Sequence, residues 1–95
     1  MAPRVIPIDA QIESVVTTED SEGGLTATVR FRGRPNADTG KVIELDAGPH
    51  GASITVLLPE GRLLCITQSA TMPPSAYYLE GVEVVLPDAP PEVTP

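Results

Sequence analysis

The sequence predicts an all-β protein: a small antiparallel β-barrel, closed or partly open, of about six strands. Apolar residues recur at every second position through most of the chain, which is typical of strands with one buried face. The strand-like segments are short and are separated by turns rich in Gly, Pro, Asn and Asp. A flat sheet of this kind would leave one face and two edges unprotected, so closure into a barrel is favoured. A two-layer β-sandwich is the second choice.

The first two predicted strands form a hairpin. Strand one is expected over residues 6–17, and strand two over residues 25–32. The residues expected to face the core are Ile6, Ile8, Ala10, Ile12, Ser14 and Val16, followed by Leu25, Ala27, Val29 and Phe31. The polar loop between the strands ends in Gly23 and Gly24, which can adopt positive φ, so an antiparallel hairpin is predicted.

Four more strands are expected over residues 41–46, 52–58, 63–68 and 77–86. In the first of them, Ile43 and Leu45 should share a face. The strands 52–58 and 63–68 are expected to form a hairpin with apolar side chains on both faces: Leu57, Leu58, Leu63 and Leu64. Two alternatives are open for this hairpin, burial on both sides or a docking surface on one side. A glycine bulge is predicted at Gly81, and Gly33 and Gly51 are further expected bends.

Length and composition indicate one domain. The chain has 95 residues, of which 41% are hydrophobic and 20% charged, as in globular proteins. We expect a β domain over residues 6–86 with an N-terminal arm (1–5) and a proline-rich C-terminal arm (87–95). A net charge of −7 argues against nucleic-acid or membrane partners. The absence of a signal-peptide pattern and a lone cysteine, Cys65, suggest a cytoplasmic or virion location.

Neither a catalytic nor a metal centre is predicted, and no cofactor is expected. His50 is the only histidine, and Asp46 and Cys65 are the groups that could accompany it as metal ligands or as a nucleophile set. The closely spaced Cys or His pairs of zinc sites are absent from the sequence. The acidic loop 19–22 does not follow the spacing of a calcium-binding EF-hand.

Three arginines form the main basic feature of this acidic chain. Arg30 and Arg32 share one face of a predicted strand, and Arg34 follows directly. They are expected either to bind a phosphate or carboxylate, or to pair with Asp9 or Glu13 on the neighbouring strand.

A further alternative comes from a resemblance. Residues 30–34 contain an Arg-x-x-x-Arg, and residues 46–51 are similar to Asp-x-Ser-x-x-Gly, with Gly48 in place of the serine. This pair resembles the motif pair of PilZ domains, six-stranded barrels that bind cyclic di-GMP. The resemblance implies that the arginines and Asp46 contact a cyclic dinucleotide. The chain departs from the family in the missing serine, in a short interval between the motifs, and in arginines that end a strand.

The favoured function is that of a non-enzymatic structural subunit of a larger assembly, such as an accessory protein of a viral particle in capsid decoration or a head–tail joint. Its partners would be copies of itself or a larger scaffold subunit. The expected contacts come from an apolar hairpin, the tyrosines and the proline-rich arm: Leu57, Leu64, Tyr77, Tyr78, Pro90, Pro91 and Val93. The alternative is an acidic inhibitor or immunity-type protein that masks a basic site with Glu19, Asp20, Glu22, Glu80 and Glu83.

Overall fold

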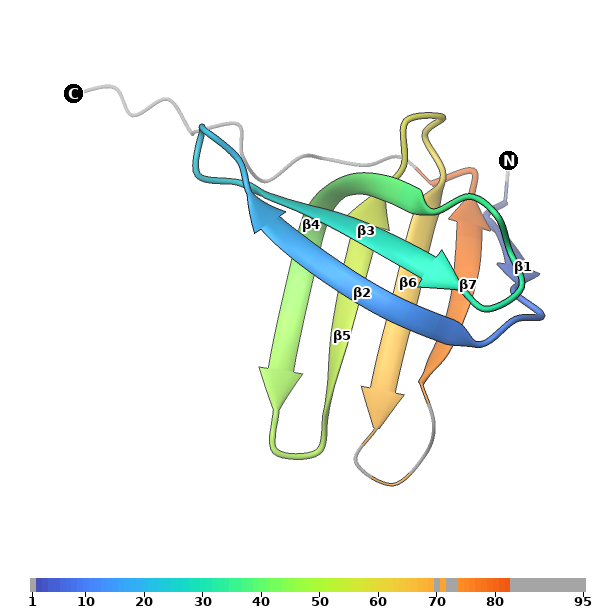
Figure 1. Ribbon diagram of the computed structural model, residues 1–95. Helices are drawn as coiled ribbons and strands as arrows, with labels where there is room; N and C mark the ends of the chain where they lie inside the picture. The colour runs from blue at the N-terminus through green and yellow to red at the C-terminus, as the bar shows by residue number, and fades with distance from the viewer. Residues whose placement is uncertain (1, 70, 72–73, 83–95) are drawn as a thin grey trace.

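The computed structural model describes residues 2–69, 71 and 74–82, and it confirms the all-β prediction. Seven strands form one antiparallel sheet in the order β1-β7-β6-β5-β4-β3-β2 (Figure 1). They are β1 (Arg4–Pro7), β2 (Ile12–Glu19), β3 (Leu25–Phe31), β4 (Asp38–Gly48), β5 (Gly51–Leu57), β6 (Leu63–Ser69) and β7 (Ser75–Glu80). Within these residues β1 pairs only with β7 and β2 only with β3, so backbone pairing does not close the sheet.

The predicted first strand is divided in two, which raises the strand count from six to seven. Its first part is β1, its second part is β2, and residues 8–11 between them belong to neither. Pro7 has no N–H to donate to a ladder, and β1 ends at this residue. Arg4 and Val5, assigned by sequence to the N-terminal arm, pair with Glu80 and Leu79 of β7.

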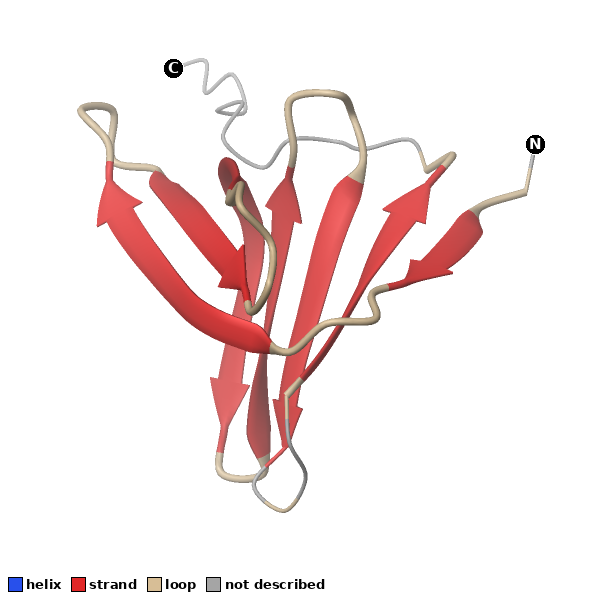
Figure 2. Cartoon of the chain, turned by 45° about the vertical axis from the view of Figure 1, so that its right-hand side comes forward, coloured by secondary structure: helices blue, strands red, loops and turns tan. Residues whose placement is uncertain are grey.

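The sheet curls so that the β2–β3 hairpin lies across β5, β6 and β7 (Figures 1 and 2). The core lies between these two layers. Its buried members come from β3, from the β5–β6 hairpin and from β7: Ala27, Val29, Phe31, Ile54, Val56, Leu58, Leu64, Ile66 and Tyr78. Ile6, Ile8, Ala10 and Ile12 pack against them as the sequence predicts, each partly buried.

A bulge in β2 overturns two predicted orientations, those of Ser14 and Val16; Ser14 lies opposite the exposed Arg30 and so faces outward. The pairing register shifts between Ile12 and Ser14, so Glu13 is an extra residue and the alternation changes phase. After the shift Val15 lies opposite the fully buried Val29 and therefore faces inward. Val16, predicted to face the core, points to the other side and is 56% exposed.

A second bulge affects β4. The register shifts between Val42 and Glu44, after which Leu45 lies opposite Ile54 on the inner side of the sheet. Ile43 is half-buried, but Leu45 is 58% exposed, so the two residues do not form the buried pair that alternation predicts. Leu45 remains exposed because β2 and β3 do not extend over this end of the sheet (Figure 1).

The remaining predictions concern turns. In the hairpin of β5 and β6, Leu58, Leu63 and Leu64 are buried and Leu57 is half-buried, which favours the alternative of burial on both faces. Strand β7 ends at Glu80, and Gly81 follows with a φ of 81°, a left-handed conformation that ends the strand. The predicted continuation over residues 83–86 and the arm 87–95 lie outside the described residues.

Strands and turns account for the whole described part of the chain. None of these segments forms a helix with the length and apolar character that a membrane crossing requires.

Candidate functional site

The inner face of the sheet is covered in one half and open in the other. Beyond the edge of β2 the open half forms an apolar groove of about 270 Å³, here called the open groove. Its lining comes from β2 and from the far ends of β4, β5 and β6: Val15, Thr17, Leu45, Ala52, Ser53, Ile54, Ile66 and Gln68. Val15 is 40% exposed and Leu45 is 58% exposed, so apolar carbon at both walls of the groove contacts solvent.

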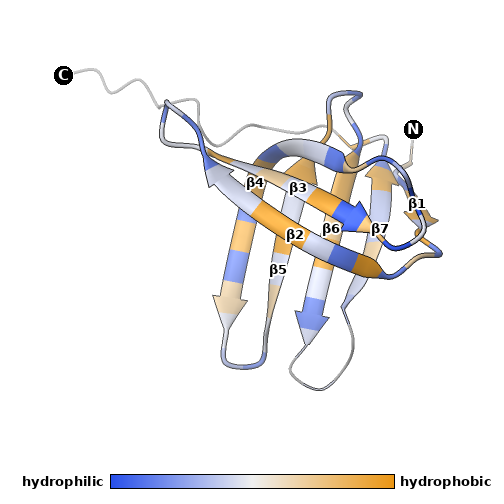
Figure 3. Cartoon of the chain, viewed as in Figure 1, coloured by the Kyte–Doolittle hydropathy of each residue, from blue (hydrophilic) through white to orange (hydrophobic). Residues whose placement is uncertain are grey.

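Strand β2 borders this groove with an unprotected edge. Residues 14–18 carry no charge and no proline, and the middle of β2 is coloured as hydrophobic in Figure 3. Natural edge strands are usually short, charged or interrupted, because free backbone groups otherwise recruit another strand. The free side of β2 over residues 14–19, here called the β2 edge, has none of these protections in its centre.

The turn after β2 fixes which backbone groups reach that edge. The N–H of Asp20 donates to the carbonyl of Gly24 at 2.8 Å, which makes this a hydrogen-bonded pair across the hairpin. Such pairs alternate along an antiparallel ladder, so Thr18 and Val16 exchange hydrogen bonds with β3. Val15 and Thr17 therefore direct their N–H and C=O groups away from β3, to the β2 edge.

A polar cluster around Tyr78 lies at the opposite, covered half. Its phenol donates to a carboxylate oxygen of Asp38 at 2.5 Å and accepts from Arg34 at 3.2 Å. The guanidinium of Arg62 lies 4.3 Å from the centre of the Tyr78 ring. Burial, followed by the hydrogen bond to Asp38, raises the pKa of Tyr78. No buried side-chain nitrogen or oxygen of the described residues lacks a hydrogen-bond partner, and the two hydrogen bonds of Tyr78 fasten β4 and β7 to the turn after β3.

The three arginines do not converge on one site. Arg34 belongs to the Tyr78 cluster, and its guanidinium also lies 5.2 Å from the ring centre of Phe31. Arg30 and Arg32 are exposed and, within the described residues, make no ion pair with Asp9 or Glu13. All three arginines are exposed, and of these only Arg34 is shown in contact with core side chains, Tyr78 and Phe31.

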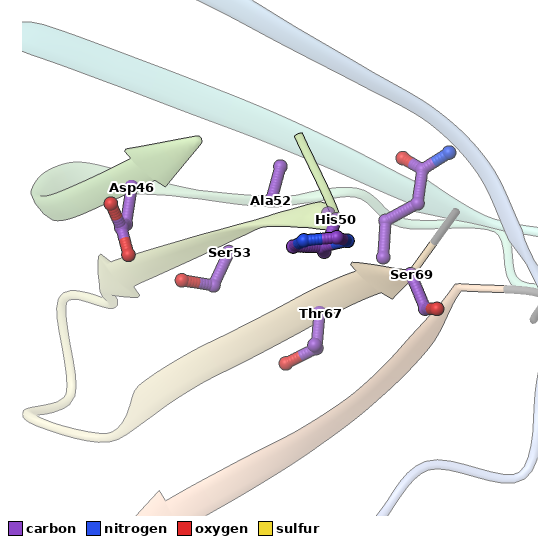
Figure 4. Close-up of a pocket in the computed structure, with 8 residues that line it drawn as sticks. Asp46, His50, Ala52, Ser53, Thr67 and Ser69 are labelled. Carbon is purple, nitrogen blue, oxygen red and sulfur yellow. The ribbon is translucent and has the colours of Figure 1, made fainter. Parts of the chain in front are cut away.

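A shallow hollow of about 250 Å³ surrounds His50 at the turn between β4 and β5 (Figure 4). Asp46, Ser53, Thr67 and Ser69 also line it, yet no hydrogen bond or ion pair among the described residues links His50 to Asp46. No group of three or more potential metal ligands occurs in the described part of the chain. Asp46, one of the two groups that the sequence offers as companions of His50, lines the same hollow.

Cys65 lies elsewhere, on the outer face of the sheet. It lines a different hollow together with Glu44 and Tyr77, which follows from the Thr55–Cys65–Tyr77 row of cross-strand pairs. The Cys65 thiol raises the pKa of the neighbouring Tyr77 phenol, because a charge on one group opposes ionisation of the other. The combination of Cys65 with Asp46 and His50 is therefore not assembled.

The residues predicted to contact a partner are not the residues that line the open groove. Leu64 is fully buried and Tyr78 is 7% exposed, so both are core side chains, whereas Leu57 and Tyr77 are half-buried. Pro90, Pro91 and Val93 lie outside the described residues. Val15, Val16 and Leu45 were not proposed as contacts, because both bulges had to be known before their exposure could be predicted.

The predicted acidic surface is also divided. Glu19, Asp20 and Glu22 lie at the β2–β3 turn, where Asp20 accepts hydrogen bonds from the backbone N–H groups of Glu22 and Gly24. Glu80 lies on β7, within 3.6 Å of Arg4 and 3.9 Å of Arg62. Glu83 is outside the described residues.

The two segments that resemble PilZ motifs also lie apart. Arg34 is linked through Tyr78 to Asp38 at the start of β4, while Asp46 lies near the end of the same strand. Eight residues of strand span up to about 26 Å. Comparisons with protein-family models, with curated proteins and with solved structures found no match to this chain.

Proposed function

We propose that this chain is a non-enzymatic interaction subunit of a larger protein assembly, and that it binds a protein partner through the open groove and the β2 edge. One observation carries the proposal. Four large hydrophobic side chains of the described residues are exposed: Val15 and Leu45 line the groove, Val16 lies on the outer face of the β2 edge, and Val5 lies on β1. Exposed apolar groups that gather in one place, instead of being scattered, are typical of a binding surface.

The curled sheet would act as a partly open barrel. Strands β1 and β2 follow one another after only residues 8–11, yet they pair with β7 and β3, towards opposite ends of the strand order. The N–H of Arg32 donates to the carbonyl of Gln11 at 2.8 Å, which extends the β2–β3 contact into that connection. These features support a barrel in which the connection of residues 8–11, and not strand pairing, joins the two ends of the sheet.

We propose more specifically that the assembly is a viral particle. The chain would act there in capsid decoration or at a head–tail joint. The small all-β fold and the net charge of −7 support it, and the step from fold to particle is one of analogy. A contribution of the proline-rich arm 87–95 stays a prediction.

Position-specific photo-crosslinking in the native source tests the proposal. The full-length chain would carry a photoreactive residue at position 16 or 45, with position 5 as the matched control. Val5 is 61% exposed but lies on β1, away from the groove. We expect crosslinks to one protein from positions 16 and 45 and few from position 5. Crosslinks from position 5 alone, or from none of the three, would overturn the proposed surface.

A further inference from the structure

We propose that the β2 edge binds an extended segment of a partner protein by antiparallel strand addition, and that this segment has an apolar centre with lysine or arginine at both ends. The inference rests on the proposed function and specifies the chemistry by which the partner is recognised.

The backbone provides the first argument. Val15 and Thr17 direct their N–H and C=O groups to the β2 edge, and no described residue pairs with β2 on that side. An added antiparallel strand would form two hydrogen-bonded pairs here, one opposite each residue. Backbone hydrogen bonds of this kind supply affinity in strand addition, and side-chain pockets supply the specificity.

The side chains determine the centre of the segment. Partner residues opposite Val15 and Thr17 would share their face and point into the open groove, whose floor includes Ile54 and Ile66. A groove of about 270 Å³ lined by apolar groups favours apolar side chains at both positions. The partner residue opposite Val16 would lie on the outer face against a 56% exposed valine, where a β-branched residue packs well.

The ends of the segment are determined by charge. Glu13 and Glu19 border the uncharged residues 14–18, and Asp9, Asp20 and Glu22 follow outside them. All five carboxylates belong to exposed residues. Lysine or arginine opposite Glu13 and Glu19 would form cross-strand ion pairs, whereas acids there would repel. The seven-residue pattern is therefore basic, any, apolar, β-branched, apolar, any, basic.

The same charges argue against two other occupants. A second copy paired with β2 around Val16 would place Glu13 opposite Glu19 at both ends. The chain's own residues 83–95 contain three carboxylates and neither lysine nor arginine. Both occupants would bring like charges to the β2 edge, so a basic-ended partner is favoured.

The first experiment measures binding of a capped palindromic heptapeptide, Lys-Thr-Val-Thr-Val-Thr-Lys, to the isotope-labelled full-length chain by NMR. The matched control carries Glu in place of both Lys. We expect the acidic peptide to bind about tenfold more weakly at low salt, with the difference shrinking at high salt. The double variant Glu13→Lys/Glu19→Lys should reverse the preference. An unchanged preference in that variant would overturn the charge argument.

The second experiment tests the hydrogen-bonding register. N-methylation of the two valines removes the donors that would face β2 and should abolish binding. N-methylation of the second and sixth residues, both threonines, removes donors that face away and should leave the affinity within about twofold. Any other pattern overturns antiparallel addition at this edge.

Hydrogen exchange completes the test. The amides of Val15 and Thr17 should exchange rapidly in the free chain and become protected when the basic peptide binds. Protection in the dilute free chain would show that residues 83–95 occupy the edge, and protection that grows with protein concentration would show a second copy. Either result overturns the proposal. Crosslinks from positions 16 and 45 without peptide binding would refute strand addition alone, whereas their absence would refute the proposed function itself.

Discussion

Strands β4, β5 and β6 pass through two different environments on the same inner face. In the covered half Val56 and Leu64 are fully buried, in a core that includes Val29 and Phe31 of the β2–β3 hairpin. In the open half the same strands continue beyond β2, and Leu45 is 58% exposed beside Ile54. The alternation of apolar residues is the same in both halves, so alternation defines the inner face of a strand without determining what covers it.

The comparison shows that the open half carries apolar residues that the fold of one chain does not bury. Folding stability depends mainly on the covered half, because burial of apolar surface is its principal source. Apolar residues in the open half contribute little to that stability while exposed. Under the proposed function, the partner would bury these residues.

The largest expected effect is in the covered half. Phe31 is 1% exposed and belongs to the buried core from its place on β3 opposite Ile12, so Phe31→Ala should remove a large buried ring and leave a cavity. We expect a loss of about 3–5 kcal/mol in the free energy of unfolding, measured by urea denaturation. A domain of this size has a total of roughly 5–15 kcal/mol, so the variant should be near its stability limit. A loss below about 1 kcal/mol would contradict the assignment of this half as the core.

A smaller loss is expected from Tyr78→Phe, which keeps the ring and removes the hydrogen bonds to Asp38 and Arg34. We expect about 1–2 kcal/mol near neutral pH. The pKa of Tyr78 is raised in the folded state, so its contribution is complete below the unfolded value of about 10 and is lost as pH rises through the folded value. The difference between wild type and variant should therefore shrink in urea titrations above about pH 10. A difference that grows there would contradict the raised pKa.

How far the sequence predicts this molecule follows from the same comparison. Period-two alternation identifies the β2–β3 hairpin and the inward residues Val29 and Phe31, because one regular strand with one buried face produces that pattern. It fails at Glu13 and Ile43, where one inserted residue reverses the phase. Both bulges lie next to or within runs of β-branched or apolar residues. In such runs either set of alternate residues could face the core, so no local signal marks the bulge.

The candidate site was missed for a related reason. The exposure of Val15, Val16 and Leu45 depends on the phase after each bulge and on how far the β2–β3 hairpin extends over the sheet. Neither is encoded in short-range periodicity. The sequence did offer an apolar docking surface as one alternative, but at the β5–β6 hairpin, where Leu58, Leu63 and Leu64 are buried.

In the open half, Leu45→Ala should have a modest effect on folding. The side chain is already 58% exposed, so its truncation removes little buried area, and we expect less than about 1 kcal/mol in urea denaturation. If the groove binds a partner, the same variant should weaken that interaction more than it weakens folding, measured by crosslinking yield at position 16. A large folding loss with unchanged crosslinking would remove the distinction between the two halves.

The smallest effect is expected outside both halves, at the turn between β5 and β6. Glu60 pairs with Arg62 at 2.8 Å, and the hydrogen bond from Arg62 lowers the pKa of Glu60. The pair is solvent-exposed and screened, so Glu60→Gln should change stability by less than about 0.5 kcal/mol. What little it contributes is present above the unfolded pKa of Glu and is lost as pH falls through the lowered folded value.

Arg62 distinguishes this turn from the covered half that it borders. Its guanidinium lies over the Tyr78 ring, so Arg62→Ala removes a contact with the core as well as the ion pair. We expect Arg62→Ala to lower the free energy of unfolding by about 0.5–1 kcal/mol in urea denaturation at neutral pH. This loss is larger than the one expected for Glu60→Gln. Equal losses would mean that the ion pair is the whole contribution of Arg62. A larger loss for Arg62→Ala that persists at high salt would show that the covered half extends through Tyr78 to this side chain.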